Sequence, residues 1–154
     1  IEAESIPEDK NIPRGTSAII CRLTDLFIEF LTYSFESSYE KWRLDSPLHA
    51  SAIFAAEGNL KIIREDVGRH VALDKLIGAS LKQKKYEDDF VITSSRASYE
   101  MVQKIAYLNL KLLVAISAPT GLAIRIADNL GITLIGFARE ARYTIYSHNE
   151  RIIE

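Results

Sequence analysis

The sequence predicts an α/β fold, in which helices pack on both faces of a mixed but mainly parallel sheet. Short apolar runs typical of buried strands, such as residues 90–93 and 111–117, alternate with segments whose apolar residues recur at helical spacing. Strand-like runs at 49–55 and 60–65 flank the turn at 57–59 (EGN) and predict a hairpin, which makes the sheet mixed. The chain has 154 residues, 47% of them apolar, which suits a single three-layer α/β/α domain with a sizeable core.

The amino-terminal part divides into an arm and the start of the domain. Residues 1–15, with two prolines and mixed charges, are interpreted as a linker or arm, and residues 16–154 as the domain. From Thr16 to Leu31, apolar residues recur at helical spacing, which predicts a helix with Cys21 on its buried side. A short polar helix is expected at 37–43, before a break at Asp45-Ser46-Pro47.

After the hairpin, helices and strands alternate. The predicted helices cover 69–82, 97–108 and 120–130, and Gly131 is the C-cap of the last one. The predicted strands cover 90–93, 111–117 and 132–137, and an edge strand is expected at 143–146.

Composition excludes several classes of protein. The net charge of -2 argues against a general binder of nucleic acid or membrane surfaces, and charged residues interrupt every apolar stretch long enough to span a bilayer. The single cysteine, Cys21, excludes an intrachain disulfide and a multi-cysteine metal site. A cytoplasmic location is therefore expected.

The predicted topology indicates where a ligand would bind. In mainly parallel sheets, ligands bind outside the carboxyl ends of the strands. The junctions at 65–70, 94–98 and 117–121 meet at that edge, and the connection at 138–142 reaches the same edge.

A cluster of charges marks the first of these junctions, in the run REDVGRHVALDK at 64–75. Gly68 would let the backbone approach a ligand, while Arg69 and His70 contact an anion at a helix N-terminus. The alternative is a turn glycine, a surface ion pair and Asp66 as a helix cap. Both interpretations remain open.

The other junctions carry weaker signals, each with a structural alternative. Ser95 and Arg96 open a helix in a turn that suits a phosphate or carboxylate, although Ser95 would also serve as an N-cap. Pro119 is typical of a helix start. Arg139 and Arg142 suit a diphosphate, but edge-strand arginines are often only solvated.

Taken with their order along the chain, these residues resemble the FdhD/NarQ family of formate dehydrogenase accessory sulfurtransferases. The resemblance rests on LHASAIF (48–54), REDVGRHVALDKLIG (64–78), SSRASYEMVQK (94–104), SAPTGLAIRIA (117–127), GITLIGFARE (131–140) and RYTIYSHNERI (142–152). It implies a cytidine deaminase-like fold for the C-terminal domain. Zinc deaminases place His and Cys ligands at helix starts; the corresponding positions here hold no cysteine, so the resemblance implies the fold without its zinc site.

The resemblance also implies a function. A cysteine desulfurase would hand over persulfide sulfur, which passes to the molybdenum cofactor, bis(molybdopterin guanine dinucleotide), before insertion into formate dehydrogenase. The protein would be a homodimer that holds the cofactor by its guanine nucleotide, for which GDP is a mimic. Together with the physical reading, the expected binding residues are Phe137, Ala138, Arg139, Glu140, Ala141 and Arg142, with His49, Glu65, Asp66, Gly68, Arg69, His70, Ser95, Arg96, Ser98, Pro119 and Thr120.

One departure leaves the enzymatic role open. The family carries sulfur on a C-x-x-C motif, which this sequence lacks, and Cys21 does not match it in context. The chain is therefore either a C-terminal fragment or a natural variant. A non-catalytic protein that binds a nucleotide or a partner on the same fold is the alternative.

Overall fold

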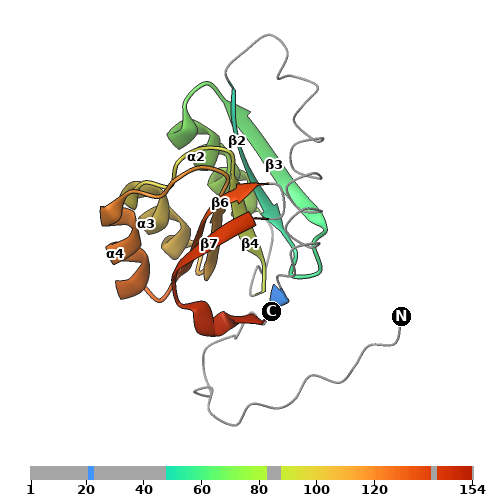
Figure 1. Cartoon of the computed structure of the whole chain (residues 1–154). Helices are drawn as coiled ribbons and strands as arrows, with labels where there is room; N and C mark the ends of the chain where they lie inside the picture. Colours follow the sequence, from blue (N-terminus) through green and yellow to red (C-terminus); the bar gives the residue numbers. More distant parts are fainter. Residues whose placement is uncertain (1–20, 23–47, 83–87, 140–141, 154) are drawn as a thin grey trace.

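The structure is a computed structural model, which describes residues 21–22, 48–82, 88–139 and 142–153 (Figure 1). The elements follow one another as β1 Cys21–Arg22, β2 His49–Phe54, β3 Leu60–Asp66, α2 Arg69–Ser80, β4 Phe90–Thr93, α3 Tyr99–Tyr107, β5 Leu112–Ala115, α4 Gly121–Asn129, β6 Thr133–Arg139, β7 Arg142–Ser147, the 3-10 turn η1 Asn149–Arg151 and β8 Ile152–Ile153.

Six strands form the central sheet, in the order β3-β2-β4-β5-β6-β7. The hairpin strand β2 is antiparallel to both β3 and β4, so β3 runs parallel to β4. Strands β4, β5 and β6 are mutually parallel, and β7 returns antiparallel to β6. The predicted α/β class with a mixed sheet is confirmed.

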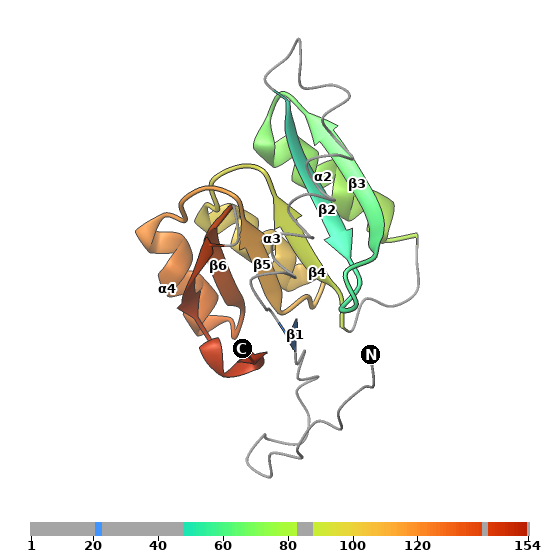
Figure 2. The same ribbon diagram turned by 45° about the vertical axis from the view of Figure 1, so that its right-hand side comes forward.

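The three described helices cover one face of the sheet (Figures 1 and 2). Each joins two parallel strands, and the right-handed preference of such crossovers places successive helices on the same side. Buried residues at helical spacing, among them Leu73, Leu76, Met101 and Ile105, pack there against strand residues such as Val91 and Leu113. No helix in the described ranges is long and apolar enough to cross a membrane.

The opposite face of the sheet has its own buried cluster, built from strand residues that include Phe54, Phe90 and Ile92. The rings of Phe54 and Phe90 stack with their centroids 5.9 Å apart. The described helices therefore form one layer. The predicted helix at 16–31 lies outside the described residues apart from Cys21 and Arg22, and the polar helix at 37–43 lies outside them entirely.

The prediction for Cys21 itself was wrong in conformation. Cys21 and Arg22 form strand β1, which pairs in parallel with Ile152 and Ile153 of β8. The apolar spacing around Cys21 predicted a helix, but hydrogen bonding to a distant strand satisfies this backbone instead.

Most other element predictions are confirmed, and the bounds differ at two places along the carboxyl edge of the sheet. The helix predicted from residue 97 begins only at Tyr99, because residues 94–98 form the turn out of β4. In the connection predicted at 138–142, residues 138–139 belong to β6 and Arg142 to β7 instead, while residues 140 and 141 lie outside the described residues.

Candidate functional site

The carboxyl edge of the sheet carries the predicted site residues that the structure describes. Strands β3, β4, β5 and β6 end there, and the antiparallel strands β2 and β7 begin there. His49 pairs with Asp66 and Arg139 with Arg142, so the open end of the β2–β3 hairpin and the connection from β6 to β7 lie at this edge. Neighbouring strands are about 4.8 Å apart, so six strands spread these residues over roughly 24 Å. They form several local groups rather than one compact pocket.

The junction between β3 and α2 is stabilised by Asp66. Its carboxylate accepts a hydrogen bond from the Gly68 amide at 3.0 Å and forms an ion pair with Lys75 Nζ at 2.6 Å. The Lys75 side chain, followed by the Gly68 N–H, holds the pKa of Asp66 below its usual value. Lys75 also donates to the carbonyl of Glu65 at 3.2 Å. The ion-pair alternative therefore describes Asp66, although Gly68 and not Asp66 occupies the N-cap position.

Two side-chain contacts connect α2 to α3. His70 Nε2 lies 3.5 Å from Glu100 Oε2, and one turn further Asp74 Oδ1 lies 2.6 Å from Lys104 Nζ. Beside the first pair, the buried atoms His70 Nδ1 and Ser98 Oγ have no hydrogen-bond partner in the described structure. Buried polar atoms are normally paired, so these two atoms mark a place where a polar ligand group could bind.

The junction between β4 and α3 is built on buried hydroxyls. Ser51 Oγ lies 3.3 Å from Thr93 Oγ1, which lies 3.1 Å from Ser95 Oγ. The interpretation of Ser95 as an N-cap was therefore wrong. Ser98 holds the N-cap position, without a side-chain cap hydrogen bond. Arg96 is exposed at this turn.

The junction between β5 and α4 contacts its neighbours on both sides. Thr120 caps α4 by accepting from the Ala123 amide at 3.2 Å, and its own amide donates to the Ala97 carbonyl at 2.9 Å. Pro119 precedes the cap and lies against Gly136 of β6, where an added Cβ would come within 2.6 Å of Pro119 Cδ. The strand β6 and the α4 start are thus in close contact.

Two register shifts distort the β6–β7 hairpin. Leu134 pairs with Ser147 and Ile135 with Ile145, which leaves Tyr146 as an extra residue in β7. A second shift, between Gly136 and Arg139, accompanies a left-handed backbone at Phe137 (φ 54°). Such bulges redirect side chains and are frequent beside active sites.

The second bulge separates Phe137 from the core. Ile135 and Ala138 both pack in the cluster on the face opposite the helices, three positions apart, whereas a regular strand would place Ile135 and Phe137 on one face. Ala138 is consequently fully buried, so its side chain faces the core. Phe137 is turned outward and is 51% exposed. Glu140 and Ala141 lie outside the described residues.

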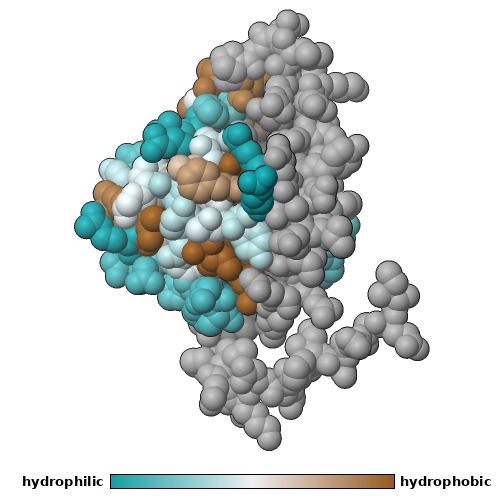
Figure 3. Space-filling model, in the orientation of Figure 1, coloured by the Kyte–Doolittle hydropathy of each residue, from teal (hydrophilic) through white to brown (hydrophobic). Residues whose placement is uncertain are grey.

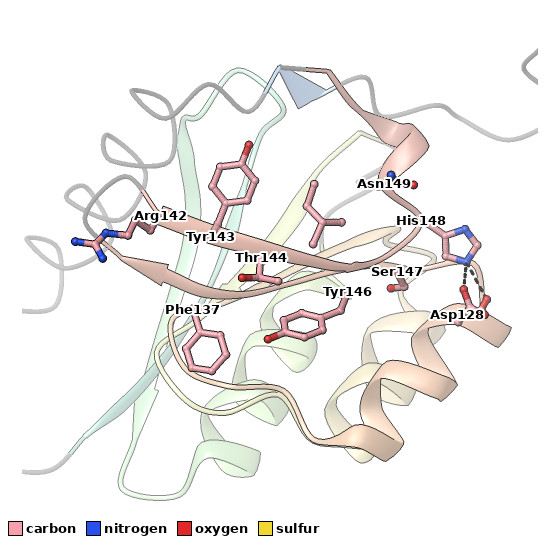
Figure 4. A pocket seen from close by; sticks show the side chains of 10 residues that line it. Asp128, Phe137, Arg142, Tyr143, Thr144, Tyr146, Ser147, His148 and Asn149 are labelled. Atoms are coloured by element: carbon pink, nitrogen blue, oxygen red, sulfur yellow. Dashed lines mark hydrogen bonds and ion pairs between the residues drawn. The ribbon is translucent and has the colours of Figure 1, made fainter.

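An open groove of about 940 Å³ follows β7, the edge strand of the described sheet. It is lined by Asp128, Phe137, Arg142, Tyr143, Thr144, Ile145, Tyr146, Ser147, His148 and Asn149. Figure 4 shows the Phe137 and Tyr146 rings on one side of β7 and the Tyr143 ring on the other. Of the predicted site residues, only Phe137 and Arg142 line this groove.

Comparison with known proteins identifies the family. The sequence model of the FdhD/NarQ family matches residues 13–153. The chain belongs to the FdhD/NarQ family. The sulfur carrier protein FdhD of Bordetella petrii is 53% identical over 105 residues, which cover 68% of this chain and 38% of that protein. The sulfur carrier protein FdhD of Xanthomonas euvesicatoria is 52% identical over 106 residues, with the same coverage.

A solved structure agrees with the family assignment. The crystal structure of a putative formate dehydrogenase accessory protein from Desulfotalea psychrophila superposes with a TM-score of 0.69 and 28% identity, over 82% of this chain and 58% of that one. The FdhD/NarQ resemblance predicted from the motifs is thus confirmed. This chain spans well under half of the length of the two curated relatives.

In this FdhD/NarQ chain, the described site holds no ready metal centre. Within residues 21–22, 48–82, 88–139 and 142–153, no three His, Cys, Asp or Glu side chains gather closely enough to bind a metal ion. The helix starts at which deaminases bind zinc present His70 and Ser98 here.

At the far end of the groove, His148 joins β7 to the end of α4. Its Nε2 lies 2.8 Å from the Asp128 carbonyl oxygen and its Nδ1 lies 2.9 Å from Glu150 Oε1, so a protonated ring can donate to both. The Asp128 carbonyl, with Glu150, raises the pKa of His148 despite partial burial. The backbone N–H of Glu150, with His148, lowers the pKa of Glu150. From the sequence alone, His148 could not be distinguished from an ordinary surface histidine.

This cluster predicts a specific pH dependence of stability. Because the pKa of His148 is raised above its ordinary 6.5, the stabilisation is complete below that value and is lost as the pH rises through the folded-state pKa. An imidazolium at a helix C-terminus contributes about 0.3–1 kcal/mol. We therefore expect the free energy of unfolding, measured by urea denaturation, to fall by about 0.3–1 kcal/mol more between pH 6 and pH 8.5 in the wild type than in His148→Asn. Asparagine tolerates the left-handed backbone that this position adopts. Equal pH dependence in both proteins would contradict the role of His148.

Glu150, the acidic partner of His148, predicts a second effect of pH on stability, in the acidic range. Because the pKa of Glu150 is lowered below its ordinary 4.5, its contribution is present above that value and is lost as the pH falls through the folded-state pKa. Glu150→Gln should therefore flatten the acid side of the stability curve.

Proposed function

We propose that this chain supplies the part of an FdhD-type sulfur carrier that binds the guanine dinucleotide form of the molybdenum cofactor. Sulfur would be added to the bound cofactor before its insertion into formate dehydrogenase. The observation that supports the proposal is the pair Arg139 and Arg142, which lie opposite each other at the carboxyl edge of the sheet in a chain of this family.

The arginine pair favours a diphosphate on electrostatic grounds. Like charges directly opposite each other on neighbouring strands are destabilising. Both arginines are exposed, and no carboxylate in the described part of the chain forms an ion pair with either of them. Guanidinium groups match phosphate oxygens in a bidentate geometry, so a bound diphosphate would relieve the repulsion.

The local groups along the edge suit a ligand that extends beyond one nucleotide. Arg69, exposed at the start of α2, and Arg96, exposed at the turn out of β4, would contact further anionic groups, with Glu65 at the same edge. The unpaired His70 Nδ1 and Ser98 Oγ would bind a polar edge of the cofactor. His49 and Thr120 complete the rim, and the Mo-containing part is the cargo that the edge would hold.

The sulfur-handling step requires partners. A cysteine desulfurase would donate the persulfide sulfur, and a homodimer in the cytoplasm is the expected assembly. The sequence contains one cysteine, Cys21, and no C-x-x-C motif. We therefore assign cofactor binding, not sulfur carriage, to the residues present here.

Calorimetric titration with GDP, with ADP as the control nucleotide, tests the binding proposal. We expect Arg139→Ala/Arg142→Ala to weaken GDP binding by about a hundredfold, because two charge-assisted hydrogen-bonding groups are lost. Lys111→Ala/Arg125→Ala removes the same charge from α4 and from the opposite edge of the sheet and should bind like the wild type. Unchanged GDP affinity in the Arg139/Arg142 variant would refute the proposed site.

The missing C-x-x-C motif favours a second candidate, a non-catalytic protein on the same fold that binds a nucleotide or a partner and moves no sulfur. Incubation with a cysteine desulfurase and cysteine, followed by intact mass measurement, tests the expectation, common to both candidates, that this chain does not carry sulfur. A gain of one sulfur atom that disappears in Cys21→Ser would assign sulfur carriage to this chain and contradict the division of roles proposed above.

A further inference from the structure

The end of β7 is fixed to the sheet, whereas the residues after it are held by a small set of polar contacts. The Ser147 hydroxyl accepts a hydrogen bond from the Leu134 amide at 3.0 Å and donates one to the Ile132 carbonyl at 2.8 Å. After His148 come η1 and β8, and β8 pairs with β1 over two residues. His148 is therefore the point about which the last residues of the chain can separate from the sheet.

The backbone of His148 suits a hinge. It is a non-glycine residue in the left-handed region, with φ 51° and ψ 54°. Such a conformation is strained and persists where the surrounding contacts hold it. Here the Thr133 hydroxyl donates to the His148 carbonyl at 2.9 Å, and the Arg151 guanidinium donates to the Thr133 hydroxyl at 3.2 Å. Release of η1 would relieve the strain.

The imidazole ring of His148 adds contacts that depend on its charge. Figure 4 shows the ring reaching from the end of β7 to Asp128, at the end of α4. Its Nε2 faces the Asp128 carbonyl and its Nδ1 faces Glu150 Oε1, and both oxygens can only accept hydrogen bonds while Glu150 is ionised. A neutral imidazole has one N–H and an imidazolium has two, so the protonated ring alone satisfies both neighbours.

The charged groups that face the ring come from two elements of the described structure. Asp128 of α4 places Oδ1 3.6 Å from Nε2, and η1 supplies Glu150 and Arg151. Strand β6 presents the Thr133 hydroxyl, which carries no charge. The His148 side chain is 24% exposed, and hydrophilic surface covers the η1 end of the molecule (Figure 3), so protons reach the ring from solvent.

We infer that His148 is a pH-operated latch, in which the protonated ring fastens η1 to the end of α4 and the neutral ring lets η1 and β8 swing out about the left-handed hinge. Opening would separate Ile152 and Ile153 from β1 and remove Ile152 from the cluster on the sheet face opposite the helices. The latch lies at the opposite end of β7 from Arg142, and it does not depend on nucleotide binding.

Hydrogen exchange of the full 154-residue chain, read by mass spectrometry in the peptide that covers 148–153, tests the latch. After correction for the intrinsic effect of pH, we expect exchange in the wild type to rise about two- to fivefold from pH 6 to pH 8.5, as the interaction of a histidine cation with a helix C-terminus allows. His148→Asn, which tolerates the left-handed backbone and cannot be protonated, should show no rise. Glu57→Gln, which removes an exposed carboxylate from the β2–β3 turn, should behave like the wild type.

Exchange in low concentrations of urea separates local opening from unfolding of the whole domain. Urea acts in proportion to the surface that an opening exposes, so exchange at 148–153 should be nearly independent of urea while that of α3 increases. The same urea dependence in both peptides would mean that the segment opens only with the whole fold, and would overturn the latch.

Equal rises with pH in the wild type and in His148→Asn would also overturn the latch. Glu150→Gln provides a second variant, at a side chain that is 64% exposed, should His148→Asn fail to fold. It replaces the carboxylate that faces Nδ1 with a neutral amide and should reduce the rise without abolishing it, because the Asp128 carbonyl still accepts from Nε2. An undiminished rise in Glu150→Gln would contradict the pairing on which the latch depends.

Discussion

Gly136→Ala is expected to lower the free energy of unfolding by about 1–3 kcal/mol, the usual effect of overpacking. A Cβ at this position would come within 2.6 Å of Pro119 Cδ and 3.0 Å of Tyr146 Cε2, so the α4 start and the β7 ring would both have to move. Since Gly136 directly precedes Phe137, the same shift should weaken GDP binding. Urea denaturation and calorimetry measure the two effects.

Gly78→Ala is the matched control. Gly78 lies within α2, and nothing lies within 4 Å of an added Cβ. Alanine has the higher helix propensity, so this change should stabilise the protein by about 0.5–1 kcal/mol and leave GDP binding intact. If both glycine variants were destabilised equally, the close approach at Gly136 would not be the cause.

Phe90→Ala is expected to have the largest effect on stability, a loss of about 3–5 kcal/mol. Phe90 is fully buried in β4 and stacks on Phe54, so truncation leaves a cavity and removes a ring contact. Denaturant titration of this variant and of Tyr107→Ala, at an exposed position, checks the value. A loss of stability near zero would mean that neighbouring side chains move in and fill the cavity left by the Phe90 ring.

The same variant distinguishes stability from binding. Phe90 begins β4, whereas the candidate site lies beyond Thr93 at the other end of that strand. The folded fraction of Phe90→Ala should therefore bind GDP with unchanged affinity.

The fold was largely predictable because its local patterns agree with its global topology. The buried strand Phe90–Thr93 begins with three consecutive apolar residues, and the three described helices carry buried residues at helical spacing. Cys21 was mispredicted because its pairing partner, Ile152, lies near the other end of the chain, and no local pattern reports such a contact.

The candidate site was predictable in place but not in detail. Strand order alone brings Asp66, Ser95, Thr120 and Arg139 to one edge. Whether a charge faces a ligand or another side chain depends on tertiary contacts, which is why the Asp66–Lys75 pair could not be distinguished beforehand. The bulge at Tyr146 changes which residues share a face, and strict alternation cannot reveal it.

The short pairing of β1 with β8 has a consequence for the order of folding. It joins residues 21–22 to residues 152–153, so its formation closes a loop that contains the entire six-stranded sheet. Loop closure over so many residues carries a large entropic penalty, and a pairing of two residues gives little in return until the sheet is formed. We therefore expect the two ends to associate after the nucleus has formed, and to separate first when the protein unfolds.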